Sequence, residues 1–246
     1  MDRMIYTAMT GATAVVNRQG VLSHNLANAA TSGFKAALST YRNVPVQGEG
    51  SSTRVFAIDA TADYLPKPGP GMFTDRNMDV MAVDNAWFGV QALDGTEGYS
   101  RNGHLEVTTD GTLVSGDGLP MLSDAGAPIT VPPGAVLTFA QNGAVIAKVG
   151  NQPAETIGRL KMVTPSPDDP FRRGADGLFR ARSGDPVPND AAARLEPGVL
   201  EGSNVNAIET IVGMIQTARQ FETQMRLLQT AESNDRTAGQ LLNLQG

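Results

Sequence analysis

The stretch NLANAATSGFKA, residues 25–36, marks the point at which the character of the chain changes. Residues 3–31 contain no proline and carry apolar side chains at mostly helical spacing, which predicts one long helix. Gly33 fits the left-handed position that often follows a helix, and Phe34 fits the hydrophobic contact that accompanies it. The predicted packing positions of this helix are Ile5, Met9, Ala12, Val16, Leu22 and Leu26.

Beyond this stretch the chain becomes rich in prolines and turn signals. Asp-Gly or Asn-Gly dipeptides occur at 94–95, 102–103, 110–111, 117–118, 142–143 and 176–177. These dipeptides supply the positive φ angles that two-residue hairpin loops require. Short strand-like runs lie between them, which predicts an antiparallel β domain over residues 83–203. Residues 37–82, spotted with prolines, are expected to form an extended linker before it.

A second long helix is predicted at residues 204–243. Asn206, followed three residues later by Glu209, resembles a capping box at its start. Apolar side chains then step by three or four positions, which is typical of an amphipathic helix with a coiled-coil-like stripe. The members of this stripe are Ile208, Ile211, Ile215, Ala218, Phe221, Met225 and Leu228.

These patterns predict an α+β fold. A central antiparallel β domain is flanked by long N- and C-terminal amphipathic helices that pair as a coiled-coil-like bundle. The helical assembly domain comprises residues 1–36 plus 204–246. Two interpretations of the second helix's stripe stay open: it forms a core within one chain, or it packs in an intermolecular bundle. The length of the stripe, and its pairing with another terminal helix, favour the bundle.

Composition argues against most kinds of chemistry. The chain has 246 residues, a net charge of −6, no cysteine and only two histidines, His24 and His104. Thiolate metal sites are therefore excluded, and a multi-histidine site has too few ligands. The chain has no basic run of the kind that predicts nucleic-acid binding, and it has no apolar run long enough to span a membrane. Motifs of nucleophilic enzymes, phosphate loops and calcium loops are absent, so we predict no catalytic residue, metal or cofactor.

Two segments resemble a known family. NLANAATSGFKA is similar to the ANxxTxGFK-like signature of bacterial flagellar axial proteins, and EGSNVNAIETIVGMIQTARQFETQM, residues 201–225, is similar to their closing helix. DNAWFGVQALDGTEGYSRNG, residues 84–103, resembles the proximal rod members of the flagellar basal-body rod protein family. A distal rod or hook protein is an alternative, as is a β domain that binds or hydrolyses cell-wall glycans. The signature positions are Asn25, Ala27, Asn28, Thr31, Gly33, Phe34 and Lys35.

The resemblance implies a structural subunit that is not an enzyme. Members polymerise through their terminal helices into a torque-transmitting shaft, so the implied partners are other proximal and distal rod subunits, further copies of the chain and the flagellar export apparatus. The implied location is the basal body in the periplasm, reached without a cleaved signal peptide. The first twenty residues agree, because they lack the apolar core and cleavage site of a secretory signal. Asn25 and Asn28 are then expected in a subunit interface; a merely local helix stop is the alternative.

Overall fold

The chain divides into two compact units in the computed structural model. The structure describes residues 2–45 and 55–243, with their side chains except those of residues 2–7, 59–63, 235, 238 and 241–243. The helical unit comprises Met1–Ala27, Ala37–Asp63 and Asn206–Gly246, and the β unit comprises Asn28–Ala36 and Tyr64–Val205. The backbone therefore passes from one unit to the other four times, after residues 27, 36, 63 and 205.

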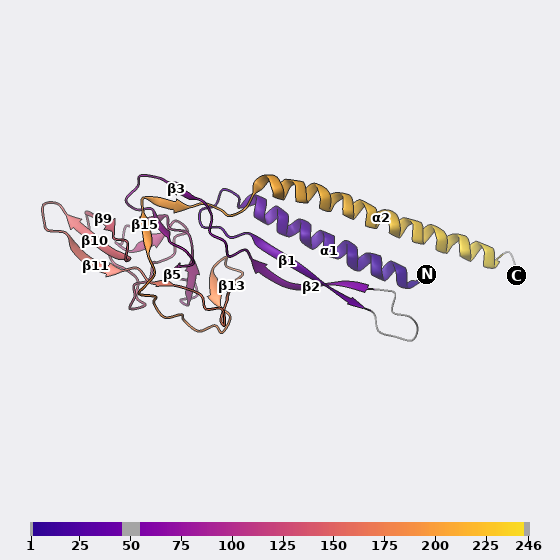
Figure 1. The fold of residues 1–246 in the computed structure, drawn as a ribbon, viewed down its shortest axis with the longest axis horizontal. Helices are drawn as coiled ribbons and strands as arrows, with labels where there is room; N and C mark the ends of the chain where they lie inside the picture. The colour runs from indigo at the N-terminus through magenta and orange to yellow at the C-terminus, as the bar shows by residue number, and fades with distance from the viewer. Residues whose placement is uncertain (1, 46–54, 244–246) are drawn as a thin grey trace. The chain divides into compact units, whose positions relative to one another are not determined.

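Two long helices dominate the helical unit (Figure 1). Helix α1 spans Asp2–Ala27 and helix α2 spans Ala207–Asn243, and they lie side by side. They are antiparallel, because Gly11 of α1 lies against Gln224 while Leu22 of α1 lies against Gly213. Helix α1 ends four residues before the predicted limit, since residues 28–33 form turns and a bend instead.

Helix α2 begins three residues after the predicted start, but its cap is the predicted one. The Asn206 side-chain oxygen accepts the backbone N–H groups of Ile208, at 3.1 Å, and Glu209, at 3.3 Å. These are two of the amides that a helix start leaves without an intrahelical partner, so Asn206 is the N-cap. Neither helix combines the length and apolar character needed to cross a membrane within the described part of the chain.

The segment expected to be an extended linker, residues 37–82, carries four strands. Strands β1 (Ala37–Pro45) and β2 (Val55–Tyr64) pair as a two-stranded sheet in the helical unit, and the Tyr41 hydroxyl of β1 donates to the Ala14 carbonyl of α1 at 2.9 Å. Strands β3 (Gly71–Phe73) and β4 (Val80–Ala82) belong to the β unit. The prolines delimit these strands rather than preventing them, because they lie at or beyond strand ends.

Every described strand pair of the β unit is antiparallel. Its largest sheet has the order β12-β5-β6-β14-β13, a second has the order β11-β10-β9, and three two-stranded ladders pair β15 with β4, β16 with β3 and β7 with β8. The bounds are β5 Trp87–Gln91, β6 Glu97–Ser100, β7 Leu105–Val107, β8 Leu113–Ser115, β9 Ala135–Phe139, β10 Ala144–Val149, β11 Glu155–Arg159, β12 Met162–Val163, β13 Phe171–Arg173, β14 Phe179–Ala181, β15 Leu195–Pro197 and β16 Val199–Glu201.

Five of the six predicted turn glycines have positive φ, between 78° and 85°, and lie at turns of the β unit. The exception is Gly103, whose dipeptide joins β6 to β7, and these strands do not pair. Gly103 serves a different purpose: a Cβ there would lie 1.6 Å from the Val80 carbonyl oxygen. Glycine is required at residue 103 for close approach of two backbones, and the hairpin prediction is wrong there.

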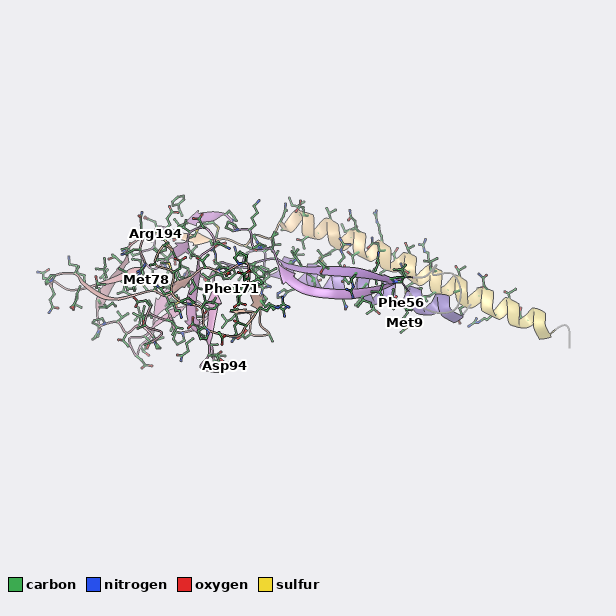
Figure 2. The ribbon with its side chains drawn as sticks, turned by 60° about the horizontal axis from the view of Figure 1, so that its bottom comes forward. Met9, Phe56, Met78, Asp94, Phe171 and Arg194 are labelled. Atoms are coloured by element: carbon green, nitrogen blue, oxygen red, sulfur yellow. The ribbon has the colours of Figure 1, made fainter. Side chains whose placement is uncertain are left out.

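Two hydrophobic clusters fill the β unit. The larger is built on aliphatic side chains such as Val90, Leu105 and Val145, all of which are buried. The smaller is aromatic and consists of Tyr64, Trp87, Tyr99, Val163, Phe171, Phe179 and Ala181. Tyr99 stacks on Phe171 with ring centroids 4.7 Å apart. Figure 2 shows the dense side-chain packing around Phe171. Trp87 of this aromatic cluster lies against the charged side chains of Lys35 and Arg101.

Candidate functional site

The side chain of Asn25 holds strand β1 against helix α1. Its amide nitrogen donates to the Ala37 carbonyl at 2.9 Å, and its oxygen accepts the Ala37 N–H at 2.8 Å. The carboxamide thus pairs with both backbone groups of one residue, as a neighbouring strand would. Asn25 is 7% exposed. The sequence placed this side chain in a subunit interface, but both of its polar groups are used within its own chain.

The turn after α1 depends on Gly33. Asn28 begins this turn, accepting the Thr31 N–H at its carbonyl, at 3.1 Å, and the Thr31 hydroxyl at its side chain, at 3.2 Å. Gly33 has φ of +70°, which confirms the predicted left-handed position. A Cβ at residue 33 would also lie 2.5 Å from the Arg101 carbonyl oxygen. The Gly33 N–H donates to the Glu201 carbonyl at 2.7 Å, so the signature here contacts the segment that precedes α2.

The signature lysine belongs to a buried charge cluster. Glu201 accepts from Lys35 Nζ at 2.6 Å, from Arg101 Nε at 2.6 Å and from the Gly69 N–H at 2.8 Å. The Glu201 side chain is 0% exposed, and those of Lys35 and Arg101 are 1% exposed. Buried charges are tolerated only when they are paired and hydrogen-bonded. We call Lys35, Arg101, Glu201 and Asn204 the Glu201 cluster.

Burial and charge oppose each other at Lys35. Burial lowers the pKa of the Lys35 ammonium group, and the nearby Arg101 charge adds to that effect, whereas Glu201 raises it through a hydrogen bond and its charge. The Trp87 ring lies below both cations, with its centroid 6.0 Å from Lys35 Nζ and 5.8 Å from Arg101 Cζ. The negative face of the indole partly replaces the lost hydration of these two cations.

Asn204 extends the cluster to the backbone. Its side-chain oxygen accepts the Ala36 N–H at 2.7 Å, while its amide nitrogen donates to the carbonyls of Leu65, at 2.9 Å, and Lys67, at 2.7 Å. The Asn204 N–H donates to the Phe34 carbonyl at 3.2 Å. Each of these segments adjoins a point where the backbone enters or leaves the β unit. The Glu201 cluster therefore gathers those points together inside the β unit.

The signature phenylalanine lies against a cation. The Arg173 guanidinium carbon is 4.5 Å from the Phe34 ring centroid and 5.0 Å from that of Phe179. Arg173 also donates to the Lys35 carbonyl at 3.0 Å. Burial lowers the pKa of Arg173, and the two aromatic faces offset part of that desolvation. Phe34 is thus held by strand β13.

Helix α2 presents two different faces. Thr210, Thr217 and Ala231 are buried and Gln224 is half-buried, on the face directed at α1. These four positions recur every seven residues and carry no large apolar side chain. The predicted apolar stripe lies mostly elsewhere: Ile208, Ile211, Ile215, Ala218, Phe221 and Met225 are exposed, and Leu228 is half-buried. Within one chain, the stripe is largely uncovered.

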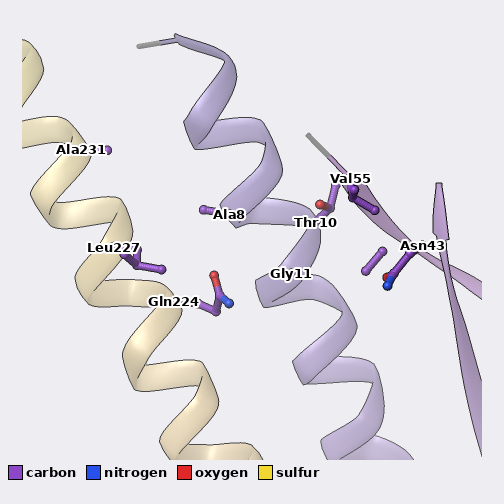
Figure 3. Close-up of a pocket in the computed structure, with 9 residues that line it drawn as sticks. Ala8, Thr10, Gly11, Asn43, Val55, Gln224, Leu227 and Ala231 are labelled. Atoms are coloured by element: carbon purple, nitrogen blue, oxygen red, sulfur yellow. The ribbon is translucent and has the colours of Figure 1, made fainter. Parts of the chain in front are cut away.

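Helix α1 shows a similar division. Met9 is 59% exposed and Val16 is 54% exposed, whereas Ala12, Leu22 and Leu26 are half-buried. The side chain of Ile5 lies outside the described residues. A hollow of about 450 Å³ lies where small residues of both helices meet strands β1 and β2. Figure 3 shows residues of α1, α2 and the two strands that line it. Its lining includes Ala8, Gly11, Gln224, Leu227 and Ala231.

The partners of the signature were missed by the sequence prediction. Arg101 and Glu201 both lie in segments that carry the family resemblance, YSRNG and EGSN, but nothing local says that they meet Lys35. A buried lysine must be paired with an acidic group. The position of Lys35 directly before an alanine and strand-like residues was the available signal that its side chain is buried and has such a partner.

His104 lies between two carboxylates elsewhere in the β unit, those of Asp79, at 2.9 Å, and Glu106, at 3.3 Å. No group of side chains suited to holding a metal ion occurs among the described residues.

Three family models match this chain. The Flagella basal body rod protein model matches residues 5–35, the Flagellar hook protein FlgE/F/G D1 domain model matches 83–147, and the Flagellar basal body rod FlgEFG protein C-terminal model matches 196–241. The Glu201 cluster draws on all three matched segments: the first contains Lys35, the second Arg101, and the third Glu201 and Asn204.

Curated relatives match nearly the whole chain. The flagellar basal-body rod protein FlgF of Escherichia coli K12 is 41% identical over 99% of this chain and 100% of the relative, and FlgF of Salmonella typhimurium is 40% identical over the same shares. The flagellar basal-body rod protein FlgG of Agrobacterium fabrum is 28% identical over 94% of this chain and 95% of the relative. Because identity of 40–41% extends over nearly the whole chain and rod-family models match both of its ends, this chain belongs to the flagellar basal-body rod protein family.

Proposed function

We propose that the chain is a structural subunit of the proximal part of the bacterial flagellar rod, and that it polymerises through α1 and α2. The observation that carries the proposal is the exposure of large apolar side chains on α2. Ile208 is 76% exposed, Ile215 is 50% exposed and Ile211 is 45% exposed in a single chain. Contiguous exposed apolar surface marks a site of association. The 41% identity to FlgF of Escherichia coli, against 28% to FlgG of Agrobacterium fabrum, supports the proximal position over the distal one.

In this proposal the two helices pair as a coiled coil of low intrinsic stability. The face of α2 toward α1 repeats every seven residues at 210, 217, 224 and 231, with Met214 and Leu228 between. A seven-residue repeat is the coiled-coil period, but Thr and Gln at these positions contribute less apolar burial than Leu or Ile. Glycines lie at both ends of the contact, Gly11 in α1 and Gly213 in α2. Such a pair gains stability when neighbouring subunits cover its outer faces.

The signature residues then act at two levels. The first level lies within one chain, where the backbone passes between the units, and its residues are Asn25, Gly33, Phe34 and Lys35. The Glu201 cluster connects the segments that lead to the helices, and through these segments torque passes into the β unit. Ala27 is exposed and Asn28 is half-exposed. Their proposed role is contact with a neighbouring subunit, together with Thr31.

The proposed partners are other proximal and distal rod subunits, further copies of the chain and the flagellar export apparatus. The proposed location is the basal body in the periplasm, reached without a cleaved signal peptide. A cysteine-free chain suits export in an unfolded state, because it refolds without forming disulfides. The proposal requires no catalytic residue or cofactor, and the relatives are named as rod proteins.

A deletion strain tests this function. Swimming and basal bodies seen by electron microscopy are scored after complementation with the full chain, with a chain lacking residues 204–246, and with an empty vector. We expect stunted rods and no swimming without the gene, and rescue only by the full chain. Normal basal bodies and swimming in the deletion strain would refute the proposal.

A further inference from the structure

Four aliphatic side chains form a compact patch at the start of α2. Ile208, Ile211, Val212 and Ile215 follow the spacing i, i+3, i+4, i+7, and their exposed fractions are 76%, 45%, 47% and 50%. This is the spacing with which an amphipathic helix inserts anchors into an apolar groove. Arg219 and Glu222 continue the same face, so the patch is bounded. We call these four residues the isoleucine patch.

An apolar groove lies in the same unit. It runs between α1 and the β1–β2 hairpin, has a volume of about 470 Å³, and is lined by Met9, Ala14, Tyr41, Phe56 and Ile58 among others. Met9 and Ile58 stay 59% and 47% exposed, so the groove is open. Figure 2 shows Met9 and Phe56 next to each other at this place. We call it the hairpin groove.

We infer that the isoleucine patch of one copy inserts into the hairpin groove of a second copy; this contact rests on the proposed function and specifies how the subunits meet. The two surfaces agree in length. From residue 208 to 215 a helix rises by about 10 Å, and the groove follows α1 from residue 9 to 17, about 12 Å. Neither surface includes a charged side chain, as expected for the core of an interface.

A second copy is the occupant because each chain carries both surfaces, and the described residues of that chain cover neither of them. The exposure of the patch shows that the described residues of the same chain leave it uncovered. Joining a patch to a groove elsewhere on an identical chain is a head-to-tail contact. Such a contact leaves one patch and one groove free at the two ends, so it continues into a ring or a helical filament rather than stopping at a dimer.

The absence of cysteine from the chain makes a cross-linking test unambiguous. Two tagged variants, Ile215→Cys and Ile58→Cys, are produced together in the deletion strain, and isolated basal bodies are mildly oxidised. We expect a covalent dimer containing one chain of each kind. The matched control pairs Ile215→Cys with Leu93→Cys, an exposed apolar residue of the β unit, and is expected to form at least ten-fold less dimer.

Three results would overturn the contact. The first is no dimer although both variants support swimming. The second is equal dimer from Ile215→Cys alone, which means that patch meets patch. The third is cross-linking of Ile215→Cys to a different rod protein only. If Ile215→Cys fails to support swimming, Val212→Cys takes its place in the same patch. Absence of the swimming-competent chain from basal bodies would instead refute the proposed function itself.

Discussion

Lys35 and Glu201 form an ion pair of 2.6 Å although they lie 166 positions apart in the chain. One partner closes the N-terminal signature and the other opens the segment that leads into α2. Both side chains are buried, so the attraction of each to the other compensates for the hydration that it loses on folding. The signature therefore forms only one half of the charge cluster. The other half is supplied when the segment around Glu201 packs against it.

Replacing Glu201 by alanine is expected to destabilise the β unit by roughly 3–5 kcal/mol, because two buried cations lose their carboxylate. Glu201→Gln should be milder, since its amide oxygen still accepts a hydrogen bond. Urea unfolding followed by the fluorescence of Trp87, the single tryptophan, reports on this unit. The control Glu196→Ala removes an exposed carboxylate and should change the free energy of unfolding by less than about 0.5 kcal/mol. Equal effects at 196 and 201 would contradict the role of the cluster.

Gly33→Ala should destabilise the β unit by more than the cost of a positive φ alone. That cost is about 1–3 kcal/mol for a residue with a side chain, and the overlap with the Arg101 carbonyl adds to it. Gly126→Ala separates the two effects, since Gly126 has φ of +81° but no atom within 4 Å of an added Cβ. Urea unfolding of both variants gives the comparison, and similar losses would mean that the close approach is unimportant.

Asn25→Asp should loosen the start of strand β1. The carboxylate still accepts the Ala37 N–H, but it places a second oxygen against the Ala37 carbonyl in place of a donor. Leaving that carbonyl without its hydrogen bond costs about 1–3 kcal/mol. Hydrogen exchange at the Ala37 amide measures the effect, and Asn43→Asp, an exposed position of the same strand, is the control. Unchanged protection of Ala37 would show that the amide pairing is dispensable.

The two faces of α2 should respond differently to substitution. Thr217→Leu adds bulk at a position that is 1% exposed against α1, and overpacking of this kind costs about 1–3 kcal/mol. Ile215→Ala removes an exposed side chain and should leave the isolated chain's helix content and thermal stability almost unchanged. Circular dichroism of the monomer checks both expectations. If Ile215→Ala proved the more damaging to the monomer, the assignment of the two faces would be reversed.

Acid should weaken the β13–β14 hairpin through Asp176. A hydrogen bond from Arg180 lowers the pKa of Asp176 below its usual value of 3.8. A carboxylate whose pKa is lower in the folded state contributes stability that is complete above pH 3.8 and is lost as pH falls below it. Asp176→Asn should therefore reduce stability at pH 6 and flatten its decline below pH 4, as followed by Trp87 fluorescence. Asp110→Asn, at an exposed turn, is the matched control, and a curve parallel to the unsubstituted chain would contradict the prediction.

Local chemistry explains what could be predicted. The cap at Asn206, the φ of Gly33 and the hairpin glycines all follow from a few neighbouring residues, since each satisfies a nearby amide or a single backbone angle. Gly103 was misassigned because glycine is needed there for the close approach of the Val80 backbone, which is distant in the sequence. The strands within residues 37–82 were missed because their prolines resemble those of a linker until strand ends are known.

The sequence by itself determined two terminal helices, an antiparallel β region between them and membership of the rod family, because period, turn chemistry and motif are local properties. Only the tertiary structure decided that Lys35 meets Glu201 and that α2 turns its threonines, not its isoleucines, toward α1. Apolar periodicity shows that a face will be covered, but not by what. Helix α2 meets α1 through Thr217, Gln224 and Ala231, which lie seven residues apart, and so its isoleucines remain exposed.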